Sequence, residues 1–372
     1  MKRGASVHRD PTLAVREFAE QVALPNPAVV IFFCSSEYDA GVISREMSQH
    51  FRCPFLGCSS AGELGSRYQK HGIVGVSFST DELMVASHFI SPLTAYSAEQ
   101  ANSIVSLLRS ELSIEDSTEG CFAFCLIDGL SSLEESFASD TYGALRGIPL
   151  VGGSAGDNLL FKETTIYHNS DYGNNAAVLL LARSSLPFEV FQFKHFIPSE
   201  KELVITEADP RTRRVIEIDG EPAAVAYAEL VGVSPAALTP AIFSENPLML
   251  EIGDEWFVRS IQSANPDQSL TLFCAIEEGL PLSIGTGKNF VETLRNHAKW
   301  LEQRQDIALT LGCDCILRRL EVEQKGLQKE VEEVLDQLRF VGFSTFGEQF
   351  NSVHVNQTLT GISFGFGNRI RP

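Results

Sequence analysis

Three segments of the chain share one pattern, and this internal repeat constrains the fold more than any other sequence feature. Each segment has a short apolar strand that ends in glycine, then a small-residue loop that closes on Gly and an acid, then a second apolar strand. The glycine-terminated strands are residues 53–57, 148–152 and 338–342. The loops are residues 58–63, 153–157 and 343–348, and the strands after them are 73–79, 176–182 and 359–365.

Another apolar strand precedes each glycine-terminated strand, and a helical pattern lies between the two. These leading strands are residues 28–34, 121–127 and 306–312. The helical stretches are residues 38–51, 132–146 and 315–337, and the third is the longest, with apolar residues at helical spacing among Glu, Gln and Lys. The repeated unit is therefore strand–helix–strand–loop–strand. Short strands rich in apolar, β-branched residues are typical of sheets that are covered on both faces.

Residues 187–285 have a different pattern, with alternating strands separated by turns and a short helix over residues 221–232. We therefore predict an α/β (mixed α+β) fold of two domains, in which mixed sheets are flanked by helices. The expected parts are an N-terminal extension over 1–27, a domain with two repeats over 28–195, and a domain over 196–372 with a β-rich insert and the third repeat. A cleft between the domains is the expected ligand site.

Charge and composition limit the function. Lys and Arg number 29 against 48 Asp and Glu, which gives a net charge of −19. Such a chain repels phosphate backbones and anionic lipid, so we expect no nucleic-acid or membrane partner. No apolar stretch approaches the ~20 residues needed to span a bilayer, and the N-terminus does not read as a signal peptide. Most of the eight cysteines lie in apolar runs without a CxxC pair, as in a reduced cytoplasmic protein.

The three small-residue loops carry the first set of candidate ligand-binding residues. Glycines there bring backbone N–H groups close to a ligand, while hydroxyls and one acid per loop add polar contacts. The candidates are Ser59, Ser60, Glu63, Ser154, Asp157, Ser344, Thr345 and Glu348. One interpretation is that the loops hold a polar ligand. The other is that they are tight turns whose side chains satisfy loop backbone.

One short motif matches the pattern of a hydrolase. Residues 152–156 fit the G-x-S-x-G pattern, with Ser154 as the nucleophile, and a cysteine is an alternative nucleophile. No signal places a base against either group, so we expect that the protein is not an enzyme. Histidines next to the last strand of a repeat, such as His168 and His354, are candidates to ligate a metal or haem iron, or to bond a nearby acid.

Several motifs in a fixed order resemble a known family. They include GCSSAGEL at 57–64, VGGSAGDNL at 151–159, IEIDGEPAAVAYAELVG at 216–232, VGFSTFGEQ at 341–349 and HVNQTLTGI at 354–362. With these residues the chain resembles a FIST protein, a bacterial sensory family named for F-box and intracellular signal transduction proteins. The resemblance covers residues 28–366 and implies a FIST N and a FIST C domain.

The resemblance implies a cytoplasmic sensor that works with a histidine kinase or a cyclase. A stand-alone chain resembles the nitric-oxide-sensing haemoproteins of the family, which implies haem b as cofactor and control of a partner kinase. Its axial-ligand candidates are His354 first, then His168 and His195. The alternative is a haem-free sensor of an amino acid or another small polar metabolite, held by the Ser/Gly/acid loops. A homo-oligomer is compatible with both.

Overall fold

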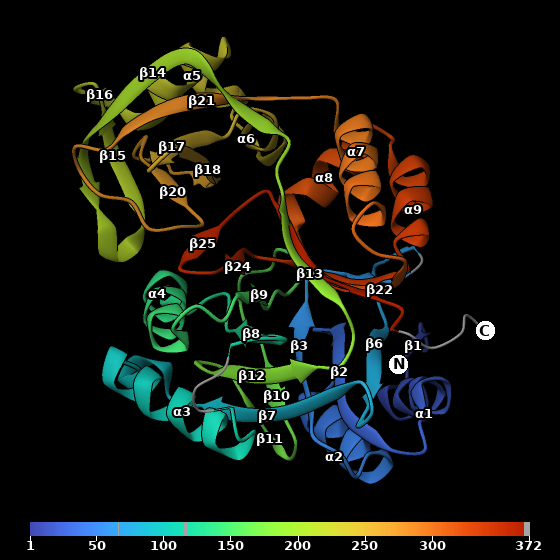
Figure 1. Cartoon of the computed structure of the whole chain (residues 1–372). Coiled ribbons are helices and arrows are strands. Elements are labelled where there is room, and N and C mark those ends of the chain that lie inside the picture. Colours follow the sequence, from blue (N-terminus) through green and yellow to red (C-terminus); the bar gives the residue numbers. More distant parts are fainter. Residues whose placement is uncertain (66, 115–117, 368–372) are drawn as a thin grey trace.

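The computed structural model describes residues 1–65, 67–114 and 118–367. It confirms a mixed α/β fold, in which the described strands form four sheets and helices pack against them (Figure 1). None of the described helices is both long enough and apolar enough to cross a membrane.

Each predicted repeat forms the predicted unit. In each, the first strand runs parallel to the glycine-containing strand and antiparallel to the last. The first repeat comprises β2 (Pro27–Ser35), α2 (Ala40–His50), β3 (Phe55–Ser60) and β6 (Ile73–Ser79). The second comprises β8 (Cys121–Ile127), α4 (Glu134–Leu145), β9 (Leu150–Ser154) and β12 (Ala177–Ser184). The third comprises β22 (Ile307–Cys315), α8 (Ile316–Gln324), α9 (Gln328–Gln337), β23 (Phe340–Thr345) and β26 (Leu359–Gly365).

The helical stretch of the third repeat differs from the prediction of one helix over 315–337. It is divided into α8 and α9, and Gly326 lies between them with a φ of 65°. A glycine in this left-handed conformation ends a helix readily, because it has no Cβ to clash with the preceding turn.

A short hairpin between the glycine-containing strand and the last strand joins each repeat to another. The hairpins are β4 (Glu63–Leu64) with β5 (Tyr68–Gln69), β10 (Ile166–His168) with β11 (Asp171–Gly173), and β24 (Glu348–Phe350) with β25 (Val353–Val355). The first repeat's β4 pairs with β23, the second repeat's β10 with β3, and the third repeat's β24 with β9. Every repeat thus donates a hairpin to one neighbour and accepts one from the other, in an approximate threefold arrangement.

One additional strand completes each of these three sheets at its other edge. These strands are β1 (Lys2–Ser6), β7 (Leu83–Ile90) and β13 (Phe188–Phe193). Residues 1–27, which we expected to be an extension, therefore begin with a strand of the first sheet, and α1 (Pro11–Val22) packs beside it. Helix α3 (Ala98–Glu111) packs against α4 and β7.

One apolar core contains side chains from all three repeats, so the C-terminal repeat packs directly against the other two. The rings of Phe33 and Phe343 stack across the boundary between the first and third repeats, with centroids 4.3 Å apart. Burial of such a side chain contributes about 1.5–3 kcal/mol. The three repeats therefore share one buried core.

The β-rich segment between the second and third repeats forms the fourth sheet, with its own apolar core. Its strands are β14 (Phe196–Asp209), β15 (Arg214–Ile218), β16 (Glu221–Pro222), β17 (Leu248–Ile252), β18 (Glu255–Arg259), β19 (Ile261–Ala264), β20 (Leu270–Leu272) and β21 (Pro281–Gly287). The predicted helix over 221–232 is α5 (Ala223–Val231), and α6 (Pro240–Glu245) follows it. Helix α7 (Phe290–Glu302) leads from this sheet into the third repeat (Figure 1).

Candidate functional site

The three small-residue loops meet and hydrogen-bond to one another through their backbones. The N–H of Ala61 donates to the carbonyl of Ser344 at 2.9 Å, and that of Phe346 donates to the carbonyl of Ser154 at 3.2 Å. The N–H of Gly156 donates to the carbonyl of Ser59 at 3.1 Å, which closes the ring. Loops far apart in the sequence thus come together as the repeats suggested, but they contact one another directly.

The polar side chains of this ring are buried, and two pairs of them bond within it. The eight loop residues that we predicted as ligand contacts are each at most 2% exposed. Ser60 Oγ donates to Glu63 Oε1 at 2.6 Å, and Thr345 Oγ1 donates to Glu348 in the corresponding place of the third repeat. Asp157 accepts hydrogen bonds from the backbone N–H groups of residues 161–163. Most of these groups therefore brace the loops, as the tight-turn interpretation requires.

Burial also changes the charge of two ring carboxyls. It raises the pKa of Glu63 to about 7 and that of Glu348 to about 8. A carboxyl that is removed from water favours its neutral form, because the interior solvates a charge poorly. At neutral pH these acids therefore offer an incoming cation much less charge than the sequence suggested.

His195, a candidate iron ligand, lies in a buried polar network with both ring nitrogens bonded. Arg318 Nη1 lies 3.2 Å from Nδ1, and Glu321 Oε2 lies 2.8 Å from Nε2. Because a guanidinium can only donate, Nδ1 accepts and Nε2 carries the proton that it donates to Glu321. Arg318, which is 1% exposed, also bonds to Asp314 Oδ1 at 2.6 Å. Neither nitrogen of His195 is available to a metal in this arrangement.

His168 lies in β10 at the edge of the first sheet and is only half-buried. Its Nε2 lies 2.9 Å from the hydroxyl of Ser87 in β7, and burial lowers its pKa. A groove of about 510 Å³ lies between β7 and the segment leading into β3, lined by residues that include Cys53, Pro54 and Met84. Of the three histidines that we predicted as axial ligands, His168 is the most exposed.

His354 lies at the centre of a second buried polar group, where the third repeat meets the β-rich sheet. Its Nδ1 accepts a hydrogen bond from Gln349 Nε2 at 3.2 Å, so Nε2 carries the proton of the neutral ring. Arg259 Nη1 donates to the carbonyl of His354 at 3.3 Å. The N–H of Ser260 donates to Oδ1 of Asn356 at 3.4 Å. We call these five residues, Arg259, Ser260, Gln349, His354 and Asn356, the His354 cluster.

Each member of the His354 cluster is buried and has one polar atom without a hydrogen-bond partner among the described residues. These atoms are Arg259 Nε, Ser260 Oγ, Gln349 Oε1, His354 Nε2 and Asn356 Nδ2. Nearly all buried polar groups in proteins are bonded, so these atoms need partners, such as an ordered water or another small polar molecule. The sequence predicted His354 here, but as an iron ligand and without the other four residues.

Gly347 allows the cluster to form, because the imidazole packs directly over it. A Cβ at this position would lie 2.2 Å from His354 Cε1 and 2.6 Å from Nε2. The same Cβ would lie 3.0 Å from Asn356 Nδ2, so the two unbonded nitrogens approach the same point. Burial lowers the pKa of His354 to about 4, and the ring is therefore neutral at physiological pH.

An ion-pair clamp borders the cluster and joins the β-rich sheet to the second repeat. Arg213 Nη2 lies 2.6 Å from Oε2 of both Glu134 and Glu135 in α4. Its Nη1 donates to the carbonyl of Phe273 at 2.6 Å, and Glu135 Oε1 accepts from the N–H of Ala275. The charges of Glu135, Arg213 and Arg259 all act on His354. The cluster thus lies where the second repeat, the third repeat and the β-rich sheet meet.

Four of the five cluster residues were missed because they come from separate segments. Arg259 ends β18 and Ser260 follows it, whereas Gln349 lies in β24 and Asn356 follows β25. The one available signal was the polar run at residues 354–358 between two apolar strands, since a polar run that stays buried needs partners. Among the described residues, no three His, Cys, Asp or Glu side chains gather as a metal site would require.

Comparisons with known proteins give two matches, which together cover most of the chain. Residues 28–221 match the model of the FIST N domain, and residues 223–351 match the model of the FIST C domain. The boundary between the matches falls at β16, inside the β-rich segment. No curated protein matches the chain.

Proposed function

Because the chain belongs to the FIST family, with a FIST N and a FIST C domain, we propose that it is a sensor that binds an amino acid or a similar small polar metabolite in the His354 cluster. The observation that carries this proposal is the set of five unbonded polar atoms on five buried residues. The proposed site for the small metabolite is therefore the His354 cluster and not the three small-residue loops.

The donors and acceptors of the cluster fit a zwitterion. Arg259 Nε, His354 Nε2 and Asn356 Nδ2 are donors, and Ser260 Oγ can add another. A guanidinium with neutral donors beside it is the set that holds a carboxylate. Gln349 Oε1 is an acceptor and suits an ammonium group. The neutral His354 ring donates without adding a second charge.

The test is a thermal-shift screen of the free amino acids and related carboxylates, followed by calorimetric titration of each hit. Arg259→Lys keeps the charge but removes the Nε donor, and Asn356→Asp turns a donor into an acceptor. Each should weaken binding about tenfold or more, since one lost bond to a charged group costs about 1.5–3 kcal/mol. Arg211→Lys is the control, because Arg211 is 93% exposed. Hits that these cluster variants bind as tightly as wild type would overturn the proposal.

The output of the sensor is proposed to be a histidine kinase or a cyclase. The cluster lies where the second repeat, the third repeat and the β-rich sheet meet. A ligand that binds one relative arrangement of these parts more tightly than another would shift the chain toward that arrangement. Kinase autophosphorylation, measured with the purified chain and with or without the ligand, tests this step. An output unchanged by a saturating ligand would show that the kinase does not read this site.

Haem-based sensing of nitric oxide is the second proposal, and it depends on His168. The other two candidates fit iron poorly, because His195 has both nitrogens bonded and the Nε2 of His354 carries the proton of its ring. His168 has a neutral hydroxyl partner, Ser87, and its ring stacks on that of Phe89, with centroids 6.3 Å apart. When bound, haem would supply an iron that takes up nitric oxide; the chain would supply the imidazole and the apolar surface.

Titration with haemin, followed by reduction and exposure to nitric oxide, tests the haem proposal. A saturable absorption band that shifts with nitric oxide, and that His168→Ala alters, is the expected result. His50→Ala is the control, because His50 is exposed in the last turn of α2. Absence of saturable binding would leave the small-metabolite proposal as the function.

A further inference from the structure

Strand β13 is an edge strand whose outer side is unpaired within the described residues. The third sheet has the order β13–β26–β22–β23–β4–β5, so β26 is the neighbour of β13 on the inner side. The N–H of Gly365 donates to the carbonyl of Pro187 at 2.8 Å, and Phe191 lies opposite Gly361 in the same register. Because antiparallel residues alternate between bonding inward and pointing outward, the backbone groups of Phe188, Val190 and Gln192 point away from the sheet.

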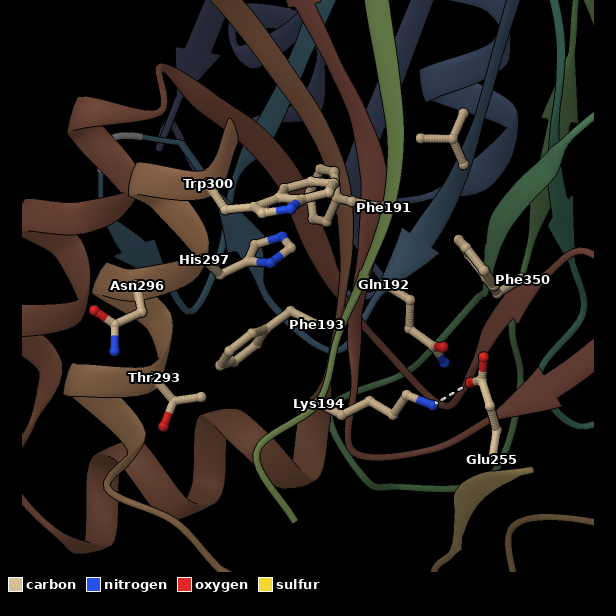
Figure 2. Close-up of a pocket in the computed structure, with 11 residues that line it drawn as sticks. Phe191, Gln192, Phe193, Lys194, Glu255, Thr293, Asn296, His297, Trp300 and Phe350 are labelled. Atoms are coloured by element: carbon tan, nitrogen blue, oxygen red, sulfur yellow. Dashed lines mark hydrogen bonds and ion pairs between the residues drawn. The ribbon is translucent and has the colours of Figure 1, made fainter. Parts of the chain in front are cut away.

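A groove of about 610 Å³ runs along this outer edge (Figure 2). Figure 2 shows Phe191, Phe193, His297 and Trp300 on one side of the strand, where α7 lies. Gln192 and Phe350, which are labelled on the other side, face away from α7. The Lys194 to Glu255 ion pair, at 2.7 Å, lies toward one end. The unpaired backbone edge is therefore flanked by side chains on both sides.

The wall on the α7 side is aromatic and contains an uncharged histidine. The ring of His297 has its centroid 5.1 Å from that of Phe191, 5.4 Å from that of Phe193 and 5.3 Å from that of Trp300. Burial lowers the pKa of His297 to about 4. Its Nε2 and the Nε2 of Gln192 have no hydrogen-bond partner among the described residues. The groove thus combines unbonded polar atoms with apolar surface.

We propose that an extended, basic segment of a partner protein binds this groove by adding a strand to β13. The backbone of the segment would bond to the outward N–H and carbonyl groups of Val190 and Gln192, while its alternate side chains contact the aromatic wall and Phe350. Strand addition to a free edge, with specificity from alternate side chains, is a general mode of peptide recognition. The groove is separate from the His354 cluster, so this inference goes beyond the proposed ligand.

Geometry and charge select this occupant. A second copy of the chain would bring its own α7 and its own flanking side chains to the same edge, whereas a single extended segment carries no walls that collide with them. The charged residues that line the groove, Lys194 and Glu255, pair with each other, so the attraction of a segment with Lys or Arg comes from the net charge of −19 of the whole chain. Binding should therefore weaken as ionic strength rises.

The test selects binders to the full-length chain from a phage-displayed library of random dodecapeptides. Val190→Pro removes one outward N–H and is tolerated at an edge strand, whereas Val190→Thr keeps the N–H and is the matched control. Synthetic versions of the selected peptides should bind wild type and Val190→Thr alike, and Val190→Pro about tenfold more weakly, as expected for one lost hydrogen bond with its neighbours. Unchanged melting temperatures would show that both variants fold.

Hydrogen exchange of individual amides locates the bound peptide. The amides of Val190 and Gln192 should become protected on binding, whereas Phe191, which already bonds toward β26, should change little. A library that yields no peptide able to distinguish Val190→Thr from Val190→Pro would overturn the proposal. Peptides that bind without protecting the amides of Val190 and Gln192 would overturn it too. A dimer in light scattering that Val190→Pro abolishes and Val190→Thr keeps would also overturn it, because the edge would then serve self-association.

Discussion

Gln349 and Phe350 are adjacent in β24, yet their side chains belong to two different sites. Gln349 Nε2 donates to His354 Nδ1 at 3.2 Å inside the His354 cluster, whereas Phe350 lines the groove beside β13. Successive side chains of a strand point to opposite faces, so a shift of β24 that favours one site must move the other. The donated hairpin of the third repeat therefore connects the proposed ligand site to the proposed partner site.

The first prediction concerns the pH dependence of stability. Burial raises the pKa of Glu348 to about 8 in the folded chain, well above the value of an unfolded glutamate. Its stabilising contribution is therefore complete below about pH 4.5 and is lost as pH rises toward about 8, by up to ~1.4 kcal/mol per pH unit. Glu348→Gln should show a smaller loss of unfolding free energy between about pH 5 and pH 8 than wild type, in urea titrations.

Glu251→Gln is the control for this measurement, because Glu251 is exposed in β17 and should leave the pH profile unchanged. Glu63 has a raised pKa of about 7, so the Glu348→Gln profile should be flatter than wild type without becoming level. Identical pH profiles for Glu348→Gln and wild type would mean that Glu348 is ionised in the folded chain.

The second prediction concerns the ion-pair clamp. Arg213→Met removes the partner of Glu134, which is 2% exposed, and of Glu135, and it also removes the bond to the Phe273 carbonyl. Breaking a buried pair costs about 3–5 kcal/mol, because one charge stays buried without its partner. Chemical denaturation should show this loss, and Arg211→Met, at a 93% exposed site, should change stability by less than about 0.5 kcal/mol. A loss no larger than that of the control would show that the clamp does not hold the β-rich sheet to α4.

The repeat pattern predicted the three strand–helix–strand–loop–strand units, because long apolar strands and their glycines are local signals. The exchange of hairpins was not predicted, since β4 and β5 are two residues each and their pairing with β23 is decided by contacts far away in the sequence. For the same reason the sequence left two interpretations of the loop serines open, contacts to a polar ligand or tight turns. Two of these serines accept hydrogen bonds from another repeat, Ser59 Oγ from the N–H of Thr165 and Ser154 Oγ from Gln349 Nε2.

The His354 cluster was less predictable than the fold. Its chemistry depends on Arg259 of the β-rich sheet meeting Asn356 of the third repeat, and no spacing in the sequence encodes that contact. The sequence also did not single out His297 as a site residue, because it lies in the middle of a helical pattern without any motif around it. A histidine in an amphipathic helix is ordinary in sequence, and only the packing of α7 against β13 places it in a groove.

The third prediction concerns Gly347. Gly347→Ala puts a Cβ 2.2 Å from the His354 ring, so the imidazole must move away from Asn356. The variant should lose amino-acid binding by about tenfold or more, since two donors of the carboxylate site are displaced together. Gly173→Ala, where an added Cβ meets nothing within 4 Å, is the control. Ligand affinity equal to wild type in Gly347→Ala would place the ligand outside the cluster.

The last prediction combines both proposals through β24. If the ligand and the partner segment favour the same position of this hairpin, each must raise the affinity of the other by the same factor, because coupling of binding free energies is reciprocal. Titrations in both orders measure the two factors, which should agree and fall within the usual range of about 5–150-fold. Phe350→Ala removes the groove contact but leaves Gln349 and His354 in place, so it should reduce the coupling factor while ligand affinity in the absence of peptide stays near the wild-type value. A coupling factor in Phe350→Ala equal to that of wild type would show that β24 does not carry the coupling. The clamp at α4 would then be the alternative route, and Arg213→Met should remove the coupling.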